Sequence, residues 1–238
     1  MECALKKVRS VSGRTDGQIA YIKTINSHKI TICHGPAGSG KTHIAAALAA
    51  WMLAKETNPV ERIILCRPVV DCGQSIGFLP GTADEKVGPY LQPLFDELGK
   101  YFDLATVNKL MDDKVIQIVP LSMMRGRTFN NSFVILDEAQ NATEDELRML
   151  LTRYGQDSKM VLAGDSSQSD MPGRDFDWVT NAVSRIPQIG ISRLGIEDIV
   201  REKLVGEIII AMDAAKNADR PVANDYAGYG DEDEDYVD

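Results

Sequence analysis

Residues 35–42 read GPAGSGKT and fit the phosphate-binding loop pattern G-x-x-x-x-G-K-[ST] at every fixed position. A β-branched run precedes the loop at residues 30–33, and a segment rich in helix-forming residues follows it at 43–50. This order of strand, loop and helix aims backbone N–H groups and the positive end of a helix dipole at phosphate oxygens. A glycine-rich turn without a ligand is the alternative, and the flanking strand and helix argue against it. The loop therefore predicts a nucleotide site, with ATP as the nucleotide.

Two side chains of the loop have specific predicted roles. Lys41 brings its ammonium group to the outer phosphates as a point charge, which makes it a predicted catalytic residue as well. Thr42 places its hydroxyl on Mg²⁺. The residues predicted to contact the nucleotide here are Gly35, Pro36, Ala37, Gly38, Ser39, Gly40, Lys41, Thr42 and His43.

The remaining pattern alternates strands with helices. Predicted strands cover residues 30–33, 62–66, 115–119, 133–136 and 160–163, and predicted helices cover 15–28, 43–50, 83–111, 144–154 and 195–215. The second strand is apolar beyond its first residue, as a parallel strand covered on both faces should be. We therefore expect an α/β fold of the P-loop NTPase type, with a mostly parallel sheet and helices on both faces.

Charge is distributed unevenly along the chain. With 238 residues and 44% hydrophobic content, the chain suits one domain and a tail. The formal charge is −9, and residues 219–238, with eight acids and one base, carry −7 of it, which leaves −2 for the rest. We predict a basic segment at 1–14, an ATPase domain at 15–215 and a disordered acidic tail at 216–238. The tail either solubilises the protein or competes with nucleic acid for a basic groove.

Several classes of protein are disfavoured by what the sequence lacks. It shows no secretory signal and no apolar run of about 18 residues, so we expect a soluble, cytoplasmic protein with no membrane partner. The four cysteines form no C-x-x-C pair, and the three histidines lack metal-ligand spacing. Structural zinc is therefore not expected, and the histidines are interpreted as packing or surface residues.

The fourth predicted strand ends in an acidic pair, Asp137 and Glu138. Open α/β sheets bind ligands at the carboxyl ends of their strands, where Asp137 would hold Mg²⁺ through its water shell. Glu138 would polarise the attacking water and act as its general base. This adjacent glutamate favours a hydrolase over a small-molecule kinase. The alternative is a surface Asp-Glu pair at the start of a helix.

The fifth predicted strand ends in residues 164–168, GDSSQ. A side-chain amide just beyond a strand that lies next to the phosphate loop can hydrogen-bond the γ-phosphate or the attacking water. Gln168 is therefore a predicted sensor of the γ-phosphate. Bonds made only while that phosphate is present would let the following loop shift on hydrolysis.

Taken together, these motifs resemble the PhoH family of phosphate-starvation-inducible ATPases, whose nucleotide domain is similar to the RecA-like core of superfamily 1 helicases. The segments that carry the resemblance are 35–42, 65–69 (LCRPV), 77–81 (GFLPG), 124–128 (MRGRT), 133–141 and 164–168. The resemblance implies an ATPase that acts on or with RNA as a single-stranded partner. It also implies a homo-oligomeric ring, with a hexamer as the expected assembly.

Further site residues follow from the same resemblance. Gln18 lies where related helicases keep a glutamine that bonds the adenine edge, and Tyr21, one turn on, would stack on the ring. Plain helix surface is the alternative for both. Residues 199–202 read IVRE where the family often has VVRH, which keeps Arg201 as the candidate arginine finger. Arg67, Arg125 and Arg127 either contact phosphate or form surface ion pairs.

The sequence also departs from the family pattern. Neither side of the predicted domain has room for the nucleic-acid-binding or nuclease module of other members, so nuclease activity is not expected. The compact form with an acidic tail is similar to phage-encoded members. The leading prediction is an ATP-hydrolysing, RNA-directed motor or remodeller. The alternative is a nucleotide-dependent assembly switch that separates no strands, and a small-molecule kinase is disfavoured.

Overall fold

The computed structural model of the chain describes residues 10–68, 95–166, 176–200, 207, 208 and 211. The chain divides into two compact units, Met1–Arg201 and Glu202–Asp238. Within the second unit, the three described residues are helical. The labelled strands and helices all belong to the first unit.

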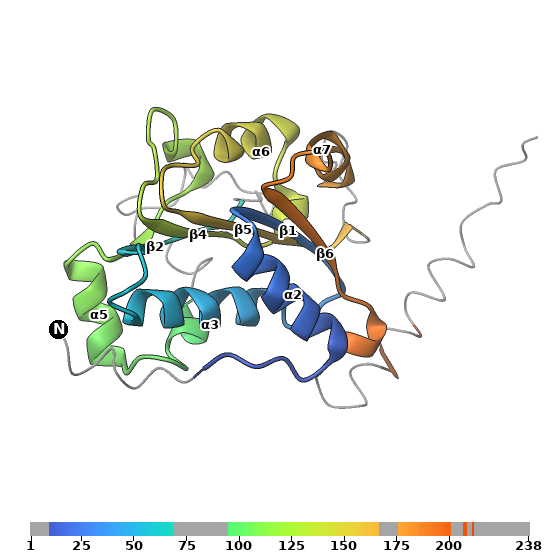
Figure 1. Cartoon of the computed structure of the whole chain (residues 1–238), viewed down its shortest axis with the longest axis horizontal. Helices are drawn as coiled ribbons and strands as arrows, with labels where there is room; N and C mark the ends of the chain where they lie inside the picture. The colour runs from blue at the N-terminus through green and yellow to red at the C-terminus, as the bar shows by residue number, and fades with distance from the viewer. Residues whose placement is uncertain (1–9, 69–94, 167–175, 201–206, 209–210, 212–238) are drawn as a thin grey trace, which may run out of the picture. The chain divides into compact units, whose positions relative to one another are not determined.

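A six-stranded sheet forms the centre of this unit, and all its strand pairs are parallel (Figure 1). The strand order is β3-β2-β4-β5-β1-β6. The strands are β1 (Ile30–His34), β2 (Arg62–Cys66), β3 (Ile116–Ile118), β4 (Ser132–Leu136), β5 (Lys159–Gly164) and β6 (Ile189–Arg193). Because β5 lies between β1 and β4, the residues after β5 are inserted between those that follow the other two strands.

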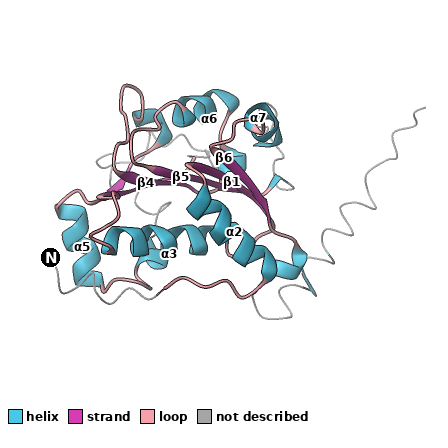
Figure 2. Ribbon diagram, in the orientation of Figure 1, coloured by secondary structure: helices cyan, strands magenta, loops and turns pink. Residues whose placement is uncertain are grey.

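Helices cover both faces of the sheet, with α2, α3 and α5 on one side and α6 and α7 on the other (Figures 1 and 2). Their bounds are α2 (Asp16–Ser27), α3 (Lys41–Ala54), α5 (Leu104–Asp112), α6 (Glu144–Leu151) and α7 (Phe176–Val183). Among the described residues there are also three complete 3-10 helices, η2 (Leu121–Met123), η3 (Ala139–Asn141) and η5 (Ile196–Asp198).

Each central strand is buried on both sides. In β2, Ile63 and Leu65 belong to the cluster under α2 and α3, whereas Ile64 and Cys66 belong to the cluster under α6 and α7. Burial of each such aliphatic side chain stabilises the fold by roughly 1.5–3 kcal/mol. This alternation explains why the strand has a continuous apolar sequence rather than a pattern of period two.

Local capping fixes where the helices begin. Thr15 caps α2, because its hydroxyl accepts from the backbone N–H of Gln18 at 3.2 Å. Thr143 and Glu146 form a capping box at the start of α6. At α3 the cap is Gly40, whose φ of 89° lies in the left-handed region that favours glycine.

The predicted α/β fold and all five predicted strands are confirmed, within a residue or two at the ends. Among the described strands and α-helices, β6 and α7 were not predicted. The predicted helix at 15–28 corresponds to α2, that at 43–50 to α3 and that at 144–154 to α6. The described part of 83–111 contains a helical turn at 95–98 and α5.

The predicted helix over 195–215 is wrong in its described N-terminal part. Residues Ile196–Asp198 form a 3-10 turn, and Ile199 is extended with φ −70° and ψ 110°. The physical reason is Asp198, which is buried and whose carboxylate accepts from Thr15 Oγ1 and from the Gly195 N–H. The Thr15 bond fastens the segment to the start of α2, and the Gly195 bond stabilises the turn itself; a regular helix would carry Asp198 away from Thr15.

Candidate active site

A cleft opens at the carboxyl ends of the central strands, with a volume of about 450 Å³. This size falls within the range of small-molecule sites. It is lined by residues of the phosphate loop, by Asp137 and Glu138 beyond β4, and by Asp165 beyond β5. The predicted loop and acidic pair therefore meet at one site.

The loop curls around the ammonium group of Lys41. Lys41 Nζ donates to the carbonyl oxygens of Gly35 at 2.5 Å and Pro36 at 3.0 Å. Gly38 and Gly40 have φ values of 85° and 89°, which only glycine adopts without strain. Burial lowers the pKa of Lys41, and the nearby carboxylates of Asp165, Glu138 and Asp137 oppose this shift. The cation thus lies where it can meet phosphate oxygens.

Thr42 and Asp137 meet directly across the cleft. Thr42 Oγ1 donates to Asp137 Oδ1 at 2.6 Å, although 95 positions separate the two residues in sequence. Asp137 is 7% exposed, and burial raises the pKa of its carboxyl group while the Thr42 bond opposes the change. A hydroxyl and a desolvated carboxylate side by side are oxygen ligands of the kind that Mg²⁺ prefers. The two residues therefore fit the predicted metal site.

Glu138 has a backbone conformation unusual for its residue type, with φ 54° and ψ 42°. Such conformations cost of order 1–3 kcal/mol and cluster at functional sites. Its Oε1 accepts from Arg67 Nη2 at 2.9 Å, and its Oε2 accepts from Gln140 Nε2 at 2.6 Å. Both oxygens of the predicted base are thereby oriented by neighbouring side chains.

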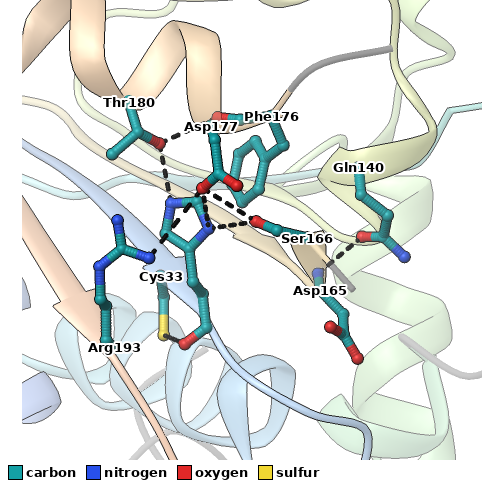
Figure 3. Close-up of polar contacts among 9 residues, drawn as sticks. Cys33, Gln140, Asp165, Ser166, Phe176, Asp177, Thr180 and Arg193 are labelled. Carbon is teal, nitrogen blue, oxygen red and sulfur yellow. Dashed lines mark hydrogen bonds and ion pairs between the residues drawn. The ribbon is translucent and has the colours of Figure 1, made fainter. Parts of the chain in front are cut away.

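Gln140 is a site residue that our sequence analysis did not single out. It is 1% exposed, and its Oε1 accepts from the Asp165 N–H at 3.0 Å (Figure 3). That bond fixes which end of the amide points at Glu138. The available signal was its position two residues after Glu138, but only tertiary structure brings its partner from the end of β5.

Gln18 lines the cleft and also braces the loop. Its Nε2 donates to the carbonyl oxygens of Ser39 at 3.0 Å and Asp198 at 3.3 Å, and its Oε1 accepts from the Arg14 N–H at 2.9 Å. Both N–H bonds of the amide are therefore used within the protein, which leaves acceptor capacity on Oε1. The predicted contact with an adenine edge stays a prediction.

The predicted stacking role of Tyr21 is wrong. Its side chain is fully buried, and its hydroxyl donates to the Lys41 carbonyl at 3.3 Å. Tyr21 supports the first turn of α3 from inside the core and presents no ring face to the cleft. Helical spacing placed it on the same side as Gln18, but that side faces the sheet rather than solvent.

His43 lies at the rim of the cleft beside two charged residues. Its Nδ1 is 2.7 Å from Glu97 Oε2, and Lys100 Nζ donates to Glu97 Oε1 at 2.6 Å. All three residues line the cleft. This polar rim was only partly predicted, because Glu97 and Lys100 come from a segment without a motif.

Other predicted residues are placed elsewhere or are not described. Gln168 and Arg201 lie outside the described residues. Arg127 donates to Gln117 Oε1 at 2.8 Å, and neither Arg127 nor Arg125 lines the cleft. Arg67, by contrast, reaches the cleft through Glu138.

The chain is similar to known proteins along most of its length. The family model described as PhoH-like protein matches residues 10–213. The chain belongs to the PhoH family. The PhoH-like protein of Mycobacterium leprae (strain TN) is 42% identical over 214 residues, which cover 89% of this chain and 61% of that protein. Protein PhoH of Escherichia coli (strain K12) is 38% identical over 199 residues, which cover 82% of this chain and 56% of that protein. The chain thus spans about 60% of the length of these PhoH relatives.

Among solved structures, the chain is similar to the large terminase of a thermophilic bacteriophage. The TM-score is 0.54 at 12% identity, and the match covers 83% of this chain and 50% of the terminase. At this identity the likeness concerns the fold alone. Together with the parallel sheet, it establishes the PhoH domain as a P-loop NTPase fold. Among the described residues, no helix has the length and apolar content needed to cross a membrane.

Proposed function

We propose that the PhoH domain of this chain binds ATP with Mg²⁺ and hydrolyses it in the cleft. The observation that carries the proposal is the contact between Thr42 and Asp137 at 2.6 Å, because it joins the two halves of a nucleoside triphosphatase site. Lys41 and Glu138 line the same cleft. Burying a carboxylate beside the loop threonine costs free energy, and a glycine-rich turn that binds no ligand does not require such a contact.

The chain's own groups divide the work of hydrolysis. Lys41 Nζ exchanges its carbonyl partners for phosphate oxygens. Thr42 and Asp137 would hold Mg²⁺. Bound Mg²⁺ would neutralise the charge that develops on the phosphate oxygens. Glu138 orients the attacking water and accepts its proton. Arg67 and Gln140 keep the Glu138 carboxylate aimed, and Gln168 contacts the γ-phosphate as its sensor.

We also propose that the ATPase is directed at RNA, as a motor or remodeller. The support is membership of the PhoH family together with Arg125 in the family motif at 124–128. The ATPase rate is measured with single-stranded RNA, with single-stranded DNA of the same sequence and with no polymer. We expect RNA to stimulate the rate strongly.

A nucleotide-dependent assembly switch is the second candidate function. The acidic tail favours it, because a charge of −7 in residues 219–238 opposes polyanion binding. An ATPase rate that no polymer changes, together with an oligomeric mass that differs between ATP and ADP, would favour the switch over the motor.

The active form is proposed to be a ring, with a hexamer as the expected assembly, in which Arg201 completes the site of the neighbouring subunit. Such arginines contribute about 10³ to 10⁵ in rate. Mixing Arg201→Ala with Lys41→Ala subunits tests this, because some mixed interfaces pair an intact loop with an intact arginine. Recovery of ATPase activity supports the shared site. No recovery, with a monomeric mass in ATP, argues against it.

A further inference from the structure

A buried histidine, His34, ends β1 directly before the phosphate loop. It is 4% exposed, and its ring lies 4.4 Å from that of Phe176 on α7. Its Nδ1 is 2.7 Å from Ser166 Oγ, and its Nε2 is 2.8 Å from Thr180 Oγ1 (Figure 3). One imidazole therefore touches the segment after β5 and a helix on the face opposite α3.

The hydrogen-bond pattern around His34 fixes the roles of its two nitrogens. Thr180 Oγ1 donates its only proton to the Phe176 carbonyl at 3.0 Å, so it accepts from the His34 Nε2–H. In the neutral ring Nδ1 is then an acceptor, to which the Ser166 hydroxyl is able to donate. Burial lowers the pKa of His34 to about 4, with Arg193 and Lys41 adding to the shift while Asp177 and Asp165 oppose it.

Ser166 has a second acceptor within reach. Its Oγ lies 3.1 Å from Asp177 Oδ1 on α7, and Asp177 is in turn 4.0 Å from Arg193 Nη1. The single hydroxyl proton of Ser166 can serve the ring or the carboxylate. Both acceptors belong to a cluster that joins β1, β6 and α7 to the residues after β5 (Figure 3).

The backbone on either side of this cluster leads into the cleft. Next to His34, Gly35 donates its N–H to the Gly164 carbonyl at 3.1 Å, and its own carbonyl holds Lys41 Nζ at 2.5 Å. Next to Ser166, the Asp165 N–H is bound to Gln140, the partner of Glu138. The imidazole is thus linked through Gly35 to Lys41, and through the Ser166–Asp165 backbone to Gln140, the partner of Glu138.

We propose that His34 is a positioning residue that couples the phosphate loop and the Asp165–Ser166 segment to helix α7. A change in the phosphates at Lys41 then moves α7 through the two bonds of the imidazole. This inference rests on the proposed ATPase function, which supplies the two nucleotide states. Every buried imidazole needs partners for both nitrogens, so a purely structural histidine and a coupling one are distinguished by the response of α7 to nucleotide rather than by the bonds themselves.

Two substitutions separate the two bonds of the ring. In His34→Asn the shorter amide reaches the position of Nδ1 and keeps Ser166, whereas in His34→Gln the longer amide reaches the position of Nε2 and keeps Thr180. Control substitutions are His28→Asn and His28→Gln, because the His28 ring bonds Thr24 and Ser27 at the end of its own helix. Thr180→Ser and Thr180→Ala form a second pair, since serine retains the hydroxyl.

Trp178 on α7 is the reporter, in a Trp51→Phe background that removes the other tryptophan. We expect Trp178 emission to differ between ADP and a non-hydrolysable ATP analogue in the parent. Both His34 variants and Thr180→Ala should lose this difference, while Thr180→Ser and the His28 variants retain it. We also expect kcat to fall about tenfold in the His34 variants, with KM for ATP changed less than about threefold.

The proposal is overturned if the parental Trp178 emission is the same in both nucleotides, or if the His34 variants keep the full response. It is also overturned if the changes in kcat and KM of the variants only follow their loss of thermal stability. If a His34 variant fails to fold, the comparison of Thr180→Ala with Thr180→Ser decides, through the same Trp178 emission measurement. If Trp178 emission of the parent responds to nucleotide but the parent hydrolyses no ATP, the proposed ATPase function is refuted. The coupling is then still tested by the Trp178 response of the variants to bound nucleotide.

Discussion

Replacing Gln140 by leucine removes the amide that joins Glu138 to the end of β5 while keeping a similar volume. The Asp165 N–H, which donates to Gln140 Oε1 at 3.0 Å, would be left buried without its partner. An unsatisfied buried donor costs about 1–3 kcal/mol. For a domain of this size each kcal/mol shifts the melting temperature by about 2–4 °C. We therefore expect Gln140→Leu to melt roughly 2–12 °C below the parent.

The effect on catalysis should exceed the effect on folding. Glu138 Oε2 loses the donor at 2.6 Å and keeps Arg67 on its other oxygen. A displacement of about 1 Å at a reacting group costs up to about 10²-fold in rate, and the whole contribution of a general base is about 10²–10⁴-fold. We expect kcat of Gln140→Leu to fall about 10- to 100-fold at roughly 20 °C, where the variant is still folded, with the affinity for ATP unchanged within about threefold.

The assay is steady-state phosphate release together with ATP binding by a fluorescent analogue. The control is Gln117→Leu, which also removes side-chain bonds, from Arg127 at 2.8 Å and to the Lys114 carbonyl at 2.9 Å, but lies away from the cleft. The control should lose little stability and no activity. A Gln140→Leu enzyme with the parental kcat would refute the positioning role.

Three further predictions follow from charge and burial. Lys41→Ala should weaken ATP binding by at least about tenfold in a filter or fluorescence assay, because the loop cation contacts ground-state phosphates. Deleting residues 219–238 removes −7 of the −9 charge, so RNA affinity should rise at low salt; titrations from about 50 to 200 mM salt that coincide for both forms would contradict this. Burial lowers the pKa of His34 from 6.5 to about 4, so between these values the unfolded chain binds a proton that the folded chain does not. Stability should therefore fall as the pH decreases from 6.5 to about 4, by up to roughly 3 kcal/mol at about 1.4 kcal/mol per pH unit, and the chemical-denaturation curve of His34→Gln should lack this component.

Local patterns explain why much of the fold and site was predictable. Continuous apolar runs predicted the five central strands, because every side chain of a strand buried on both faces must be apolar or otherwise compatible with burial. The phosphate loop is contiguous in sequence, and so is the Asp137-Glu138 pair. The parallel topology places both at the carboxyl edge of the sheet, since the phosphate loop follows β1 and Asp137 follows β4.

The missed strand β6 depends on tertiary packing. Ile189 and Ile191 are separated by Gly190, and glycine is depleted in strands, so this short segment resembles a loop more than a buried strand. Gly190 is needed because a Cβ there would collide with the Thr24 side chain on α2. This close approach exists only once α2 covers the edge of the sheet. Likewise, Asp198 leaves the predicted helix because its partner, Thr15, lies 183 positions away.

The polar partners around the site were the least predictable part. His34 has no metal-ligand spacing and was interpreted as an ordinary packing or surface residue, yet its partners Ser166 and Thr180 lie 132 and 146 positions along the chain. Gln140 and Asp165 are 25 positions apart. Helix and strand periodicity, which concerns neighbouring residues only, cannot predict hydrogen-bond partners this far apart in the sequence. They arise because β5 lies between β1 and β4, so its following residues meet both neighbours.

The central claim is that Glu138 is the general base of an ATPase, and Glu138→Gln tests it most directly. Glutamine keeps the shape and can still bond Arg67 through its carbonyl oxygen, although its NH2 then loses the bond from Gln140 Nε2. It takes no proton from water. Single-turnover hydrolysis and equilibrium binding are measured on the same sample with Mg²⁺ and ATP. The account predicts ATP affinity within about threefold of the parent and a rate lower by about 10²–10⁴-fold. A Glu138→Gln protein that hydrolyses ATP at the parental rate would contradict it.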